Sequence, residues 1–126
     1  MRYEEFISKV AERVGMAPDE RTQGLVAAVF RTLGERLSGG EARDLRAQLP
    51  EELKAQLISP QENAQGFGVE EFARRVAQRV GVDEAQAREG TSAVLETLRV
   101  AVSRGEYDDV LAQLGRDFAA LADTAG

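Results

Sequence analysis

The sequence contains two copies of one segment, and this internal duplication constrains the fold more than any single motif. Residues 3–16, YEEFISKVAERVGM, match residues 69–82, VEEFARRVAQRVGV, with eight identities in fourteen positions. After a deletion of one residue, residues 28–49 match residues 93–114 with eleven identities. We therefore predict internal repeats at 3–58 and 69–122, joined by a linker at 59–68.

Both copies carry apolar residues at helical spacing, and neither shows the alternation of a strand. Gly15 and Gly81 stand where a glycine commonly follows the end of a helix. The pattern predicts an all-α fold of about eight helices, arranged as two pseudo-twofold-related four-helix halves that share one core. Because a unit of about sixty residues is only marginally stable alone, we expect residues 1–126 to form a single domain.

The predicted linker is polar apart from Phe67. With Gly68 as the cap, Phe67 and Phe72 have the spacing of a hydrophobic staple, and Glu71 stands where a capping carboxylate lies. An apolar ring at this place is also a candidate for contact with a partner.

Composition excludes several classes of function. The chain has no histidine and no cysteine, so it lacks the usual general base, thiolate chemistry and the commonest metal ligands. Its net charge is −6, which on average repels nucleic acid and anionic membranes. The charged start and the absence of a long apolar run lead us to expect a cytoplasmic protein without a membrane segment.

Four residues of the duplicated segment are predicted to cap helices. Ser38 with Glu41, and Ser103 with Glu106, each fit the capping box, in which serine accepts from the backbone and glutamate returns a bond to the cap. The alternative is a hard-metal site. Glu41 and Asp44 share one helix face, as do Glu106 and Asp109, and carboxylate oxygens are the ligands that suit Mg²⁺, Ca²⁺ or Mn²⁺. The capping interpretation explains the residues without an ion, so we expect no metal site and no cofactor.

The doubled EEFxxxVAxRVG segment, together with SGGEARDLRAQLPEEL at residues 38–53, resembles the bacterial family catalogued as domain of unknown function 2267. The resemblance covers nearly the whole chain and implies an α-helical bacterial domain. It implies no activity, substrate or cofactor that could be carried to particular residues. The second copy departs from the pattern where Gly115 replaces Pro50, a proline that we expect at the first position of a helix.

The remaining hypotheses concern binding. We expect a non-enzymatic interaction domain that binds another protein or a second copy, with Arg43, Arg46, Tyr107 and Phe67 as candidate partner-binding residues. The first alternative is nucleic-acid association through the basic residues of the first helix in each copy, namely Lys9, Arg13, Arg74, Arg75 and Arg79. Their spacing to Glu5 and Glu71 favours salt bridges within the helices instead. A carboxylate or metal-dependent enzyme is the last alternative.

Overall fold

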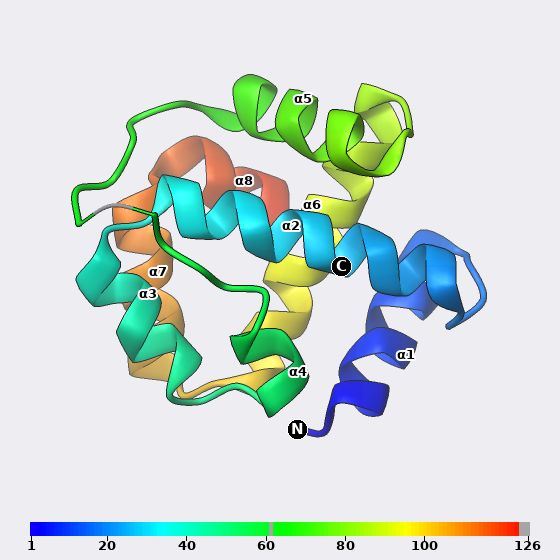
Figure 1. The fold of residues 1–126 in the computed structure, drawn as a ribbon, viewed down its shortest axis with the longest axis horizontal. Coiled ribbons are helices and arrows are strands. Elements are labelled where there is room, and N and C mark those ends of the chain that lie inside the picture. Colours follow the sequence, from blue (N-terminus) through cyan, green and yellow to red (C-terminus); the bar gives the residue numbers. More distant parts are fainter. Residues whose placement is uncertain (61, 124–126) are drawn as a thin grey trace.

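The computed structural model describes residues 1–60 and 62–123, and these residues form eight α-helices and no strand (Figure 1). The helices are α1 (Tyr3–Val14), α2 (Glu20–Arg36), α3 (Gly39–Arg46), α4 (Glu51–Lys54), α5 (Val69–Val80), α6 (Glu84–Ala101), α7 (Arg104–Leu114) and α8 (Arg116–Asp123). The predicted all-α class is confirmed. Residue 61 of the predicted linker lies outside the described residues, and none of the described helices is long and apolar enough to cross a membrane.

Local signals set the ends of the helices. Gly15 and Gly81 follow α1 and α5 with φ of 71° and 72°, a left-handed conformation that glycine adopts without steric cost. Asp83 begins α6 with a complete capping box, because its side chain accepts from the Gln86 N–H and the Gln86 side chain accepts from the N–H of Asp83. The expected position of Pro50 is wrong by one residue. It is the N-cap of α4, where its extended ψ of 158° precedes the first helical residue.

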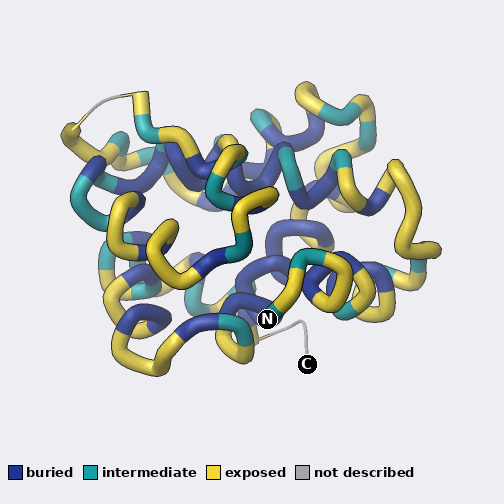
Figure 2. The backbone as a smooth tube through the Cα atoms, turned by 60° about the horizontal axis from the view of Figure 1, so that its bottom comes forward, coloured by how far each residue is buried: buried dark blue, intermediate teal, exposed yellow. Residues whose placement is uncertain are grey.

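The core joins the two halves of the chain. Helix α1 contacts α6 more extensively than it contacts α2, and α2 contacts α5 more extensively than it contacts α1. The fully buried rings of Phe6, Phe30, Phe72 and Phe118 belong to one cluster of apolar side chains. Buried positions therefore line the inward side of helices throughout the chain, while the loops at the periphery are mostly exposed (Figure 2).

Two glycines allow close approach at the crossings of α2. A Cβ added at Gly90 in α6 would lie 2.7 Å from Leu25 Cδ1, so the side chain of Leu25 occupies the space that a larger residue would need. A Cβ at Gly34 would overlap the backbone carbonyl of Ile58. The first contact allows α2 to cross α6 closely in the middle of the molecule (Figure 1), and the second allows the segment after α4 to pass against α2.

Arg36 ties the end of α2 to two other segments. Its side chain is buried and donates from Nε to the carbonyl of Phe67 at 2.8 Å, and from Nη2 to the carbonyl of Leu114 at 2.9 Å. Its guanidinium lies 5.5 Å from the centre of the Phe118 ring. Burial lowers the pKa of Arg36. The second copy has Ala101 at this position, so repetition of the sequence gave no signal for this contact.

Candidate functional site

Helices α3 and α7 lie side by side and begin with the same serine cap. Ser38 Oγ accepts a hydrogen bond from the N–H of Glu41 at 3.2 Å, and Ser103 Oγ accepts one from the N–H of Glu106, also at 3.2 Å. Both serines have extended backbone conformations, as N-caps require.

The other half of the expected capping boxes is replaced by an exchange between the copies. Gln113 Oε1 accepts the N–H of Ser38 at 2.5 Å, and Gln48 Oε1 accepts the N–H of Ser103 at 2.7 Å. Each amide nitrogen donates to the same serine's Oγ, at 3.2 Å from Gln113 and 3.1 Å from Gln48. The return bonds predicted from Glu41 are therefore absent, as are those from Glu106. Both copies carry glutamine at the equivalent positions 48 and 113, and this repetition is the sequence signal that could have indicated the exchange.

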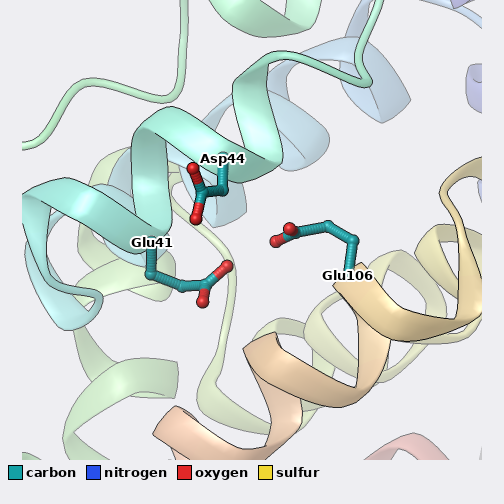
Figure 3. Close-up of side chains that lie close together, drawn as sticks. All are labelled: Glu41, Asp44 and Glu106. Carbon is teal, nitrogen blue, oxygen red and sulfur yellow. The ribbon is translucent and has the colours of Figure 1, made fainter.

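Because glutamine occupies the caps, the side chains of Glu41 and Glu106 are directed toward each other instead (Figure 3). Figure 3 shows the carboxylates of Glu41 on α3 and Glu106 on α7 facing each other, with the carboxylate of Asp44 on α3 close by. One oxygen of each residue lies within 4.8 Å of the other two. The structure thus brings together residues from both copies that the sequence assigned to separate caps.

The carboxylates in this junction are poorly compensated. Glu106 is only 8% exposed, and its Oε2 and the Oε2 of Glu41 are buried without a hydrogen-bond partner. The pKa of Glu41 is raised to about 8, first by burial, then by its hydrogen bond with Glu106 and by the negative charges of the neighbouring carboxylates. The pair of Glu41 and Glu106 therefore holds a proton at neutral pH, and this proton can bridge the two side chains.

The four residues proposed for partner binding have different surroundings. Arg43 is exposed and pairs with Glu62 at 3.4 Å, and Arg46 is exposed on the same helix. Tyr107 is 8% exposed and belongs to the core, and burial raises its pKa. Phe67 is half-buried, and its ring centre lies 6.2 Å from that of Phe72, as the staple spacing predicts. These contacts do not join the four into one surface.

The arginines of α5 are engaged within the molecule. Arg74 and Arg75 both bind Glu71, at 2.6 and 2.8 Å, and the guanidinium of Arg75 lies 3.9 Å from the centre of the Phe67 ring. Arg79 binds Glu35 at 2.8 Å, and this hydrogen bond is the main reason that the pKa of Glu35 is lowered. Each of these positive charges therefore already has a partner.

A groove of about 590 Å³ lies where the ends of α1 and α5 meet the starts of α2 and α6. Its apolar lining comes from corresponding positions of the two copies, Val14 and Met16 in the first and Val80 and Val82 in the second. All four side chains are half-buried, so part of each apolar surface faces solvent. Val14 and Val80 belong to the apolar pattern of helical spacing and pack partly against the core, so the pattern alone gave no sign of the groove that they share.

Comparison with known families places the chain. The model of the family described as an uncharacterized conserved protein, DUF2267, matches residues 3–121, which is nearly the whole chain. The chain belongs to the DUF2267 family. The resemblance noted in the sequence is thereby confirmed. No curated protein matches the chain.

Proposed function

We propose that this DUF2267 chain is a non-enzymatic interaction domain of the cytoplasm, and that the apolar groove between α1 and α5 is the surface through which it associates. The observation that supports the proposal is the pairing of Val14 and Met16 with Val80 and Val82 around one hollow. Half-exposed apolar side chains gain free energy when a partner removes them from water.

The partner that fits this groove best is a second copy of the chain. The groove is also lined by charges of both signs, with Glu20 and Arg21 from the first copy and Glu89 from the second. A second copy that presents the same groove would bring apolar residues together and could place an arginine opposite a glutamate.

We propose that residues 3–58 and 69–122 are related by a pseudo-twofold axis and form one cooperative unit, without independent domains. The reciprocal bonds from Gln48 to Ser103 and from Gln113 to Ser38 support this arrangement. The matching contacts of α1 with α6 and of α5 with α2 support it as well.

Contacts on α5 favour protein association over nucleic-acid binding. Arg74, Arg75 and Arg79 would have to leave carboxylates at 2.6–2.8 Å before they could meet phosphates. The net charge of −6 adds a repulsive average field.

Sedimentation velocity over a range of concentrations tests the groove. Met16→Glu places a charge in the apolar lining and is expected to weaken self-association at least tenfold, since burial of a methionine side chain is worth roughly 1.5–3 kcal/mol. Gly24→Leu fills the hollow from α2, where an added Cβ would meet nothing within 4 Å, and is expected to have the same effect without loss of stability.

Val100→Glu is the matched control, because Val100 is 60% exposed and does not line the groove. It introduces the same charge at an apolar surface position and should leave association unchanged. A wild-type chain that stays monomeric at every concentration would refute self-association. Equal weakening by Val100→Glu and Met16→Glu would refute the assignment of the groove.

A further inference from the structure

The junction of α3 and α7 holds more negative charge than the protein neutralises. Among the described residues, no lysine or arginine forms an ion pair with Glu41, Asp44 or Glu106, and Arg43 on α3 binds Glu62 instead. Asp109 on α7 adds a further negative charge near Glu41. Carboxylates gathered in this way repel one another unless a proton or a cation lies between them.

Two buried carboxylate oxygens mark the place where a cation would bind. Glu106 is more than nine-tenths buried and is aimed at the carboxylates of α3, yet its Oε2 has no hydrogen-bond partner (Figure 3). The Oε2 of Glu41 is equally buried and equally without a partner. A buried carboxylate oxygen without a donor is costly. A proton shared between Glu41 and Glu106 relieves part of this cost, and a coordinated cation in its place would bind both carboxylates at once.

The three carboxylate oxygens are close enough to bind one ion. Calcium binds oxygen at about 2.3–2.6 Å, so ligands on opposite sides of the ion are separated by up to roughly 5 Å. Magnesium binds at about 2.0–2.1 Å, which limits this separation to roughly 4 Å. The three oxygens lie within 4.8 Å of one another, which is inside the span of a calcium shell. Calcium also accepts irregular arrangements of oxygen ligands, whereas magnesium demands near-ideal octahedral geometry, so three carboxylates fixed on two helices favour calcium. Asp44 is exposed and gives the ion a route from solvent.

We propose that Glu41, Asp44 and Glu106 form a divalent-cation site of the calcium class that joins α3 of the first copy to α7 of the second. Three carboxylates supply the protein ligands, and water completes the coordination shell on the side of Asp44. The ion bridges the two helices that also exchange Gln48 and Gln113, so its binding stabilises the contact between the copies.

Isothermal titration of the full chain with CaCl₂, after dialysis against a chelator, tests the site. We expect one Ca²⁺ per chain and weaker binding of Mg²⁺. Glu106→Gln should reduce the Ca²⁺ affinity at least tenfold, and CaCl₂ should raise the melting temperature of the wild type while leaving that of this variant unchanged. Asp108→Asn is the control, because it removes one charge from an exposed position on α7 and should change the affinity less than twofold.

Asp44→Asn provides a second variant that does not disturb a buried residue, and it should also weaken binding. Mn²⁺ used as a paramagnetic probe should broaden the amide resonances of residues 41, 44 and 106 before others. The proposal is overturned if the wild type shows no saturable Ca²⁺ binding, if Glu106→Gln and Asp44→Asn bind as tightly as Asp108→Asn, or if Mn²⁺ broadens a different part of the chain.

Discussion

The stability of this protein should fall as the pH rises from 5 to 8 when divalent ions are removed by a chelator. The folded state raises the pKa of Glu41 from its ordinary value of 4.5 to about 8, so the folded chain keeps a proton that the unfolded chain loses. A group of this kind contributes stability that is fully present below pH 4.5 and is lost as the pH rises through 8. The decline should therefore occupy the interval between these two values.

The size of the decline follows from the same shift. One proton retained by the folded state changes the free energy of unfolding by about 1.4 kcal/mol per pH unit, which sets an upper limit of about 5 kcal/mol over the interval. Because water reaches part of the Glu41 side chain, we expect a loss on the order of 3 kcal/mol. The chain has no histidine and no cysteine, so no side chain of either type titrates in this interval and obscures the effect.

Urea unfolding followed by circular dichroism at pH 5, 6, 7 and 8, in the presence of EDTA, measures this loss. Glu41→Gln removes the titrating group and should flatten the profile, whereas Asp108→Asn should leave the slope unchanged. A wild-type profile that is flat or rises across the interval would show that the carboxylates are not strained as described. A slope that survives in Glu41→Gln would assign the effect to another group.

Two further predictions concern contacts between distant segments. Arg36→Ala should lower the free energy of unfolding by about 4 kcal/mol in chemical denaturation, because it removes two charge-assisted hydrogen bonds and a contact with an aromatic ring. A loss below about 1 kcal/mol would contradict this prediction. Gln113→Ala should cost about 1–2 kcal/mol and speed amide hydrogen exchange at Ser38, whose N–H loses its acceptor, and unchanged exchange there would exclude the described bond.

The sequence predicted the features that depend on neighbouring residues. Gly15 and Gly81 end their helices where the pattern placed them, and Ser38 and Ser103 lie at the N-caps of α3 and α7, because these signals act within one turn of the chain. Pro50 was misplaced by one residue because proline is compatible with the extended N-cap as well as with the first helical position.

Features that depend on contacts across the fold were not predictable in this way. Glu41 and Glu106 are 65 positions apart, and only the packing of α3 on α7 shows that glutamine takes over the cap and leaves the carboxylates facing each other. In the sequence Arg36 is an ordinary charged residue near a helix end, but in the fold it donates hydrogen bonds to two backbone carbonyl groups from distant segments. The groove could not be predicted for the same reason, because half of its lining comes from each copy.

In the proposed arrangement, each half completes the core of the other, since α1 packs on α6 and α5 packs on α2. The most direct measurement is circular dichroism combined with sedimentation of residues 1–58 alone, at several concentrations, beside the full chain. We expect little helix at low concentration, with helix forming only as two such segments pair and replace the missing half. A segment that is a helical monomer at every concentration and unfolds cooperatively would contradict the shared core.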